Sequence, residues 1–481
     1  MPAMLDLSAS EYQLARFLIE RGLGAVYVIA FVVALRQFPP LNGAGGLQPA
    51  PRVLQATTFW QTPSLFHLRY SDRLLRTAAG AGAVLGLLIV IGLPQRAPLP
   101  VTMATWFALW VLYQSIVNIG GTFYGFGWES LLLEAGFLAV FLGNDAVAPP
   151  LPVILAYRWL GFRLEFGAGM IKLRGDPCWR QLTCMDWHHE TQPMPNPLSW
   201  FFHHLPRPLH RLEVFGNFAA QLVLPFGLFL PQPVASIVAV LMIATQLYLV
   251  ASGNYAWLNW LTIVILCSGL ADRIAGVHEL GGTQLGGMPL WFTVAVLALA
   301  AMVLVLSWWP ARNLLSSRQV MNASFDPLHL VNTYGAFGSV GRRRYEVILE
   351  GTGDETIGPE TQWREYELPG KPGGVRRMPW QYAPYHLRLD WLMWFLPLSA
   401  DYGRGWFHPL LTKLLEGDAA ILRLFAHNPF PHQPPRYVRA LLYEYRFTSW
   451  SERRQSGAWW SRTFAEVFVD PVRLPHRGRG A

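Results

Sequence analysis

Long apolar runs recur along the first 310 residues, and they constrain the fold more than any other feature of this sequence. A helix needs about 20 predominantly apolar residues to cross the hydrocarbon core of a bilayer, and most of these runs reach or approach that length. We expect about eight transmembrane helices, with seven to nine allowed. The nine candidate runs lie near residues 17–35, 77–93, 103–119, 130–142, 153–173, 214–230, 234–251, 255–270 and 289–309. The run at 130–142 is short, and the two runs around Gly253 could form one broken unit, which gives eight as the central count.

Charged residues divide the chain into two parts. The first 310 residues contain 30 Asp, Glu, Lys and Arg, and the remaining 171 contain 38. Only 14% of the whole chain is charged, whereas soluble domains average about 25%. We therefore expect an α-helical multispan transmembrane domain over residues 1–312, with a polar loop at 174–212, and a C-terminal mixed α/β soluble domain over residues 313–481.

The C-terminal part shows both strand and helix patterns. β-branched and aromatic residues with partial alternation favour strands, and Gly-Pro turns separate them from longer apolar stretches. We expect strands at 343–351, 361–368 and 439–447, and helices at 387–396 and 408–426, the second interrupted at Gly417.

The net charge of +8 suits contact with anionic membrane lipids. The basic residues are dispersed, and their one triplet, Arg342–Arg344, has the pattern of a solvated turn, so no nucleic-acid partner is expected. Only three of the 38 basic residues are lysines, Lys172, Lys371 and Lys413. This arginine bias favours a bacterial protein of the cytoplasmic (inner) membrane; a eukaryotic protein would belong to the endoplasmic reticulum membrane.

The predicted span at 153–173 carries Arg158, Arg163, Glu165 and Lys172. Each such residue costs about 2.5–3.5 kcal/mol at membrane depth. Arg158, Glu165 and Lys172 are seven residues apart and share one helix face. Glu165 could neutralise Arg158 while Lys172 extends to the interface. Alternatively, these side chains line a functional polar cavity in which Lys172, unlike arginine, could act as a base.

Two carboxylates in the predicted span at 130–142 and its approach add to this polar set. Glu129 lies at a helix start, where the helix dipole favours an anion, so capping explains it. Glu134 lies deeper, without a local partner, and could face the stripe that contains Lys172. The catalytic hypothesis uses Lys172, Glu165 and Glu134, in a cavity completed by Glu129, Arg158 and Arg163.

The polar loop has its own reactive side chains. Cys178 and Cys184 have five residues between them and could form a disulfide on an oxidising side of the membrane. A metal site with His188 and His189 is the alternative, but the spacing matches no standard zinc pattern, and we assign no metal. His203, His204 and His210 follow in an aromatic cluster typical of a membrane interface. Further candidate contact residues of the loop are Asp176, Trp179, Asp186, His188, His189 and Glu190.

Four stretches resemble the lipase maturation factors. They are TFWQTPSLFHLRYSD, which ends at Asp72, FGWESLLLEAGFLAVFLG (126–143), LEFGAGMIKLRGDPCWRQLTCMDWHHETQPMPNP (164–197) and LVNTYGAFGSVGRRRYEVILEGT (330–352). Members of that family are multispan membrane proteins, in eukaryotes of the endoplasmic reticulum, that secreted lipases need to become active. The resemblance implies a maturation or folding factor with a secreted lipase or another exported protein as its client. Cys178 and Cys184 match the family pattern.

A shorter piece, AGMIKLRGDPCW, is similar to the lysine segment of the vitamin K-dependent gamma-carboxylases. In that family the matching lysine deprotonates a reduced quinone, a role that would belong here to Lys172 alone. The alternative function is therefore a membrane enzyme that acts on a lipid-soluble substrate, with a quinone or lipid bound. Otherwise no cofactor is expected. A transporter is a third class, for which the sequence shows no convincing inverted repeat.

Overall fold

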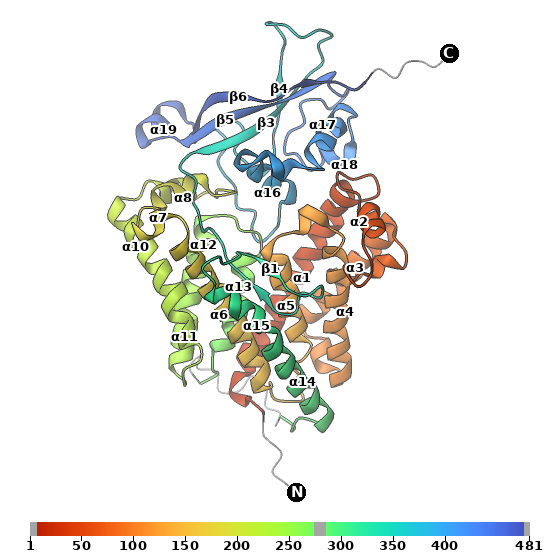
Figure 1. The fold of residues 1–481 in the computed structure, drawn as a ribbon, viewed down its shortest axis with the longest axis vertical. Helices are drawn as coiled ribbons and strands as arrows, with labels where there is room; N and C mark the ends of the chain where they lie inside the picture. The colour runs from red at the N-terminus through yellow and green to blue at the C-terminus, as the bar shows by residue number, and fades with distance from the viewer. Residues whose placement is uncertain (1–6, 274–284, 476–481) are drawn as a thin grey trace.

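The computed structural model describes residues 7–273 and 285–475 of the 481. A bundle of helices forms its lower part in Figure 1, and a small antiparallel sheet lies across the upper end. The first turns of α1 (Gln13–Asn42) lie at the opposite end of the bundle from the sheet.

Within the described residues, five helical segments are long and apolar enough to cross a membrane. They contain α1 (Gln13–Asn42), α3 (Asp72–Ile91), α4 (Leu99–Val117), α12 (Val234–Ser252) and α14 (Leu290–Leu306), and the last continues into α15 (Trp308–Leu315). The expected class, an integral membrane protein of helices, is confirmed. The expected count of eight spans is not supported.

The other predicted spans are also helical, but each is either too short or too polar to cross a membrane as a single apolar helix. Helices α5 (Gly127–Ala139) and α13 (Leu258–Leu266) are short, and α6 (Leu151–Arg174) is long but carries the charged residues. Helix α10 (Arg207–Phe218) leads through a π-helical turn, Ala219–Val223, into α11 (Leu224–Gly227). Pro225 explains the wider turn, because its ring would clash with a carbonyl one turn earlier in a regular α-helix.

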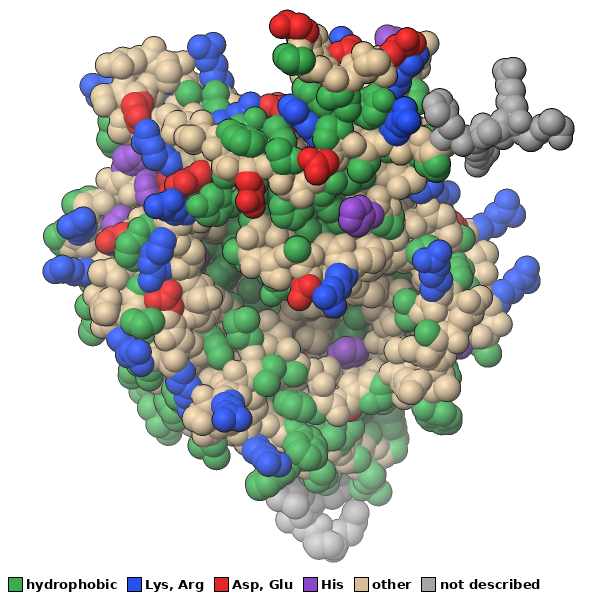
Figure 2. Space-filling model, turned by 45° about the horizontal axis from the view of Figure 1, so that its top comes forward, with side chains coloured by type: hydrophobic (Ala, Val, Ile, Leu, Met, Phe, Trp, Pro, Cys, Tyr) green, Lys and Arg blue, Asp and Glu red, His purple; other side chains and the backbone are tan. Residues whose placement is uncertain are grey.

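The five long helices differ in how far they are buried. In the most apolar part of each segment, 56% of the α1 residues are buried, against 28% in α3 and 22% in α14. Leu304 and Val305 of α14 are 76% and 72% exposed. On the face of the molecule drawn in Figure 2, hydrophobic side chains gather along the lower edge. Lipid would cover the exposed apolar surface of α3 and α14. The high burial of α1 places that helix at the centre of the bundle.

The C-terminal sheet has the order β4-β3-β5-β6, and all neighbouring strands are antiparallel. The strands are β3 (Arg344–Thr352), β4 (Arg364–Tyr366), β5 (Tyr437–Phe447) and β6 (Trp460–Val472). The first three lie where the sequence predicted strands, and β6 is an additional one. Helix α19 (Trp450–Ser456), with a capping box formed by Ser449 and Glu452, connects β5 to β6.

The remaining helices lie around the sheet and at its junction with the bundle. Helix α16 (Arg388–Phe395) fills the predicted position at 387–396. The predicted helix at 408–426 is divided into α17 (Phe407–Leu415) and α18 (Ala419–Leu422), because Gly417 has φ +67° and breaks the helix. Short strands β1 (Ala323–Ser324) and β2 (Asn332–Thr333), in the segment before β3, pair with each other, and α2 (Ala50–Ala56) follows α1.

Candidate functional site

The end of α6 is tied to the segment that leads into the C-terminal sheet. The Asp176 amide donates to the Gly338 carbonyl at 2.8 Å. A Cβ atom on Gly175 would lie 2.2 Å from that carbonyl oxygen, so only glycine permits this crossing. The polar loop therefore starts in direct contact with a segment that is more than 160 positions away in the sequence.

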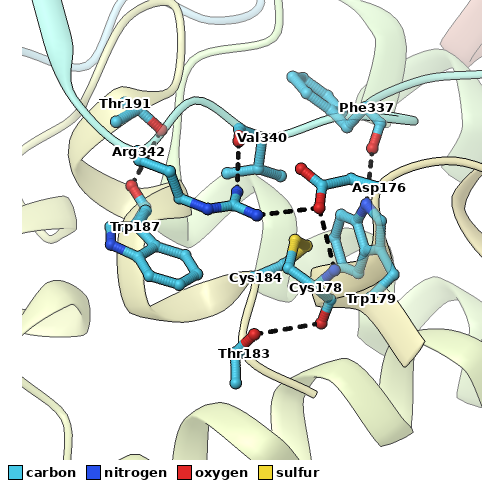
Figure 3. The surroundings of a disulfide bond; sticks show 10 residues. All are labelled: Asp176, Cys178, Trp179, Thr183, Cys184, Trp187, Thr191, Phe337, Val340 and Arg342. Atoms are coloured by element: carbon cyan, nitrogen blue, oxygen red, sulfur yellow. Dashed lines mark hydrogen bonds and ion pairs between the residues drawn. A yellow bond between two sulfur atoms is a disulfide. The ribbon is translucent and has the colours of Figure 1, made fainter. Parts of the chain in front are cut away.

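A disulfide joins Cys178 of α7 (Pro177–Arg180) to Cys184, directly before α8 (Met185–Thr191). Figure 3 shows it beneath Asp176, whose side chain accepts a hydrogen bond from the Cys178 amide at 2.9 Å and caps α7. Both cysteines are buried. Since bonded sulfurs are not available as thiolates, the alternative metal site with these two cysteines is wrong.

The disulfide loop, residues 174–198, is held to the segment before β3 by polar contacts (Figure 3). Arg342 forms an ion pair of 2.9 Å with Asp176 and lies 4.3 Å above the Trp187 ring. The Trp179 indole donates to the Phe337 carbonyl at 3.0 Å. Burial opposes ionisation of Asp176, but hydrogen bonds from Arg342 and the Cys178 amide hold its pKa below the usual value.

Arg344 fixes the far side of the same loop. Its buried guanidinium donates to the carbonyls of Glu190 at 2.9 Å and Pro193 at 3.1 Å. The Glu190 carboxylate in turn accepts from the Phe447 amide at 2.6 Å, at the end of β5. The expectation that Arg342–Arg344 is a solvated turn is therefore wrong for Arg344, which joins the loop to the sheet.

The other predicted contact residues of the loop lie in α8. His188 shares a hydrogen bond of 3.1 Å with the Tyr255 hydroxyl, and Asp186 lies half-buried in the first turn of the helix. A cavity of about 130 Å³ opens between α8, the segment 337–345 and the end of α16. Its lining includes His188, Thr191, Phe337, Arg343, Tyr345 and Trp394.

A separate polar network surrounds Lys172 inside the bundle. The Lys172 ammonium donates to the side-chain oxygens of Asn217 and Gln221, both at 2.9 Å. Gln221 donates to Glu165 at 3.1 Å, and Gln246 donates to the other Glu165 oxygen at 2.6 Å. Lys172 and Glu165 thus belong to one network, linked through the amide of Gln221 in the π-helical turn.

Two expectations about this stripe are wrong. Arg158 donates to the Ser268 carbonyl at 3.0 Å and lies 4.9 Å above the Tyr12 ring, so Glu165 does not neutralise it. Seven residues of helix span about 10 Å, and Arg158 contacts nearer partners at Ser268 and Tyr12. Lys172 is only 5% exposed and does not extend to solvent.

Glu134 belongs to another cluster. It forms a buried ion pair with Arg163 and accepts hydrogen bonds from the Asn332 amide at 3.0 Å and the Tyr334 hydroxyl at 2.7 Å. These partners connect α5, α6 and β2. The structure therefore does not assemble Lys172, Glu165 and Glu134 in one catalytic set, because Glu134 is fully occupied elsewhere.

Glu129 pairs with the C-terminal domain. Its carboxylate lies 2.7 Å from the Arg388 guanidinium of α16, which also donates to the Phe123 carbonyl at 2.7 Å and lies 3.5 Å above the Tyr124 ring. Glu129 lies in the first turn of α5, as predicted, but no side-chain hydrogen bond caps this helix, so the main partner of Glu129 is Arg388. The proposed polar cavity of Glu129, Arg158 and Arg163 is instead three separate, occupied contacts.

Sequence reasoning missed several residues that organise the site. Arg388 is too far in sequence from its partner to be found by local pattern, and the same holds for Arg344. The i,i+3 spacing of His210 and Glu213 in α10 was a usable signal, because such residues share a helix face. The structure joins this pair at 2.7 Å, so the interpretation of His210 as only an interfacial residue is incomplete.

Comparison with known proteins gives one consistent result. Residues 14–277 match the model of the lipase maturation factor transmembrane domain, and residues 330–470 match that of the lipase maturation factor C-terminal domain. Lipase maturation factor 1 of Bos taurus is 42% identical, over 97% of this chain and 90% of the relative. The Homo sapiens protein of that name is 40% identical, and lipase maturation factor 2 of Homo sapiens is 29% identical. No solved structure matches the chain.

Proposed function

Because this chain belongs to the lipase maturation factor family, we propose that it is a membrane-bound factor that brings secreted lipases to their active folded form. Beyond family membership, one observation supports this proposal: the disulfide loop is in direct contact with the C-terminal sheet and the segment that leads into it. Arg344 and the Asp176–Arg342 ion pair join the two at one end of the bundle. Together they offer a client one continuous surface outside the spans.

This surface faces an oxidising compartment in our proposal. Disulfides persist in the lumen of the endoplasmic reticulum or the bacterial periplasm and are rare in the cytosol. The helices α7 and α8, which the Cys178–Cys184 disulfide joins, lie at the same end of the bundle as the sheet (Figure 1). The relatives named above are animal proteins, which favours the endoplasmic reticulum membrane. They lend no support to the predicted bacterial inner membrane.

The client surface combines charge with exposed apolar groups. Leu398, which lines the cavity beside α8, is 57% exposed, and Trp380 is 65% exposed. Exposed apolar groups rimmed by polar residues are typical of protein-binding surfaces. Buried Trp391 and Trp406, by contrast, belong to the core of the domain. An immature lipase, which still exposes apolar surface, is the partner that fits this composition.

The proposal is tested in cells that lack their own lipase maturation factor. A secreted lipase is expressed with this chain or with an empty vector, and active enzyme is divided by total secreted enzyme. We expect this ratio to rise with the chain. An unchanged ratio, with the chain present in the membrane, would overturn the proposal.

The network around Lys172 supports one second candidate, a membrane enzyme with Lys172 as general base. The side-chain oxygens of two neutral amides accept hydrogen bonds from its ammonium. Such a buried lysine can give up its proton more readily than an exposed one. A quinone or another lipid-soluble acid would be the substrate class. Under this candidate Glu165 acts only through Gln221, and Glu134 has no part.

A further inference from the structure

We propose that His189, His210 and Glu213 form a binding site for a divalent zinc ion beside the disulfide loop. His189 belongs to α8, and His210 and Glu213 belong to α10. One ligand atom from each residue lies within 4.8 Å of the other two. The set of two imidazoles and one carboxylate matches zinc sites with three protein ligands and one open position.

The distances are close to those that a bound ion requires. His189 Nε2 lies 3.2 Å from one oxygen of Glu213, and His210 Nδ1 lies 2.7 Å from the other. In a tetrahedral site with bonds of about 2.0–2.1 Å, neighbouring ligand atoms are about 3.3 Å apart. Small rotations of the three side chains would therefore admit the ion without moving the helices.

The surroundings favour a built site over a chance surface cluster. The side chains of His189, His210 and Glu213 are 1%, 4% and 10% exposed. The Tyr248 hydroxyl of α12 also donates to Glu213, which gives the carboxylate a supporting contact of the kind that orients metal ligands. Residues three apart on one helix, as His210 and Glu213 are, recur as paired ligands in helical metal sites.

The donor atoms select the kind of ion. Calcium and magnesium prefer sites made only of oxygen ligands, whereas imidazole nitrogen suits zinc and its neighbours in the transition series. Zinc has no redox chemistry of its own, so it would not disturb the nearby disulfide. A bound ion would tie α8 to α10. This role is independent of which client the protein serves.

The test uses the purified full chain in detergent micelles, stripped with a chelator and then returned to zinc chloride. Bound zinc is counted by elemental analysis after desalting, and the melting temperature is recorded with zinc and with chelator. We expect about one zinc per chain and a higher melting temperature with zinc, because an ion that binds only the folded state stabilises it. Failure of the wild-type chain to retain zinc would overturn the proposal.

Two variants locate the ion. Glu213→Gln keeps the shape of the side chain but removes its charge, and it should lose the bound zinc and the zinc-dependent rise in melting temperature. His204→Gln is the matched control, because His204 follows α9 (Ser199–His203), forms a hydrogen bond with the Trp200 carbonyl and is outside the triad. It should retain both. Zinc binding that survives Glu213→Gln unchanged would show that the ion lies elsewhere and would refute the site; if that variant does not fold, the wild-type zinc count decides.

Discussion

Arg388 of the C-terminal domain and Glu129 of α5 form an ion pair of 2.7 Å whose side chains are 0% and 1% exposed. The pair lies where the sheet-bearing part of the chain meets the bundle, and Gln37 of α1 adds a hydrogen bond of 3.0 Å from the Arg388 amide. The regions matched by the two family models are therefore joined through buried polar contacts as well as apolar ones.

Breaking this pair should destabilise the whole protein. Glu129→Gln leaves the Arg388 charge buried without its counter-ion, and the loss of one partner of a buried pair costs about 3–5 kcal/mol. We expect a clearly lower melting temperature in detergent and faster proteolysis between the two parts. Asp401→Asn, in an exposed pair with Arg404, is the control and should change little. Equal effects of the two substitutions would contradict the coupling role.

Asp390 should make stability depend on pH. Burial raises its pKa to about 7, against hydrogen bonding from the Gly370 amide and the charges of Lys371 and Arg377. Because the pKa of Asp390 is higher in the folded protein than in the unfolded chain, where it is about 4, the protonated side chain stabilises the fold at low pH. This contribution is complete below pH about 4 and is lost as the pH rises through about 7. Asp390→Asn cannot ionise, so its melting temperature relative to wild type should rise between pH 5 and 7 and then level off. A difference in melting temperature that does not change between pH 5 and 7 would refute the assignment.

The disulfide should stabilise the loop and report its side of the membrane. Cys178 and Cys184 close a short loop, for which chain entropy predicts about 2 kcal/mol. Cys184→Ala or reduction should lower the melting temperature. In sealed vesicles of a Cys267→Ala chain, an impermeant thiol reagent should label the loop only after reduction and only from the lumenal side. Labelling without reduction, or from the cytosolic side, would contradict the proposed orientation.

Gly175 should not tolerate a side chain. Its Cβ would lie 2.2 Å from the Gly338 carbonyl oxygen, and overpacking of this kind costs about 1–3 kcal/mol. Gly80→Ala in α3, where a Cβ meets nothing within 4 Å, is the matched control and should be neutral or slightly stabilising. The melting temperatures of Gly175→Ala and Gly80→Ala, each compared with wild type, test how closely the backbone at Gly338 approaches the end of α6. A tolerated Gly175→Ala would mean that the crossing is looser than the structure shows.

Much of the fold could be predicted from sequence because apolar runs and turn residues act locally. Every predicted span is helical, and the break at Gly417 was found from one residue. The count of spans failed because α5 and α13 are short helices inside the bundle, and a hydrophobic run does not distinguish a buried helix from a lipid-facing one. Strand β6 was missed since its middle is mostly exposed and lacks a clear alternation.

The site was less predictable because its partners are distant in sequence. Glu129 was assigned to a cap by a local rule, while its true partner Arg388 lies 259 residues away. Glu165 and Arg158 share a face, but the helix rise separates them. Cys178 and Cys184, six positions apart, needed only short-range reasoning. Charged residues in an apolar segment show that a polar partner must exist, and only the tertiary structure shows which one.

The proposed function is that this protein matures lipases without acid–base chemistry at Lys172. The most direct test is the lipase assay with three vectors, which carry the wild type, Lys172→Arg or no insert. Arginine keeps the charge and can still donate to Asn217 and Gln221, but it cannot act as a base. We predict that the wild type and Lys172→Arg both raise the ratio of active to total secreted lipase. Rescue by wild type alone, with Lys172→Arg folded and present in the membrane, would contradict this account and assign catalysis to Lys172.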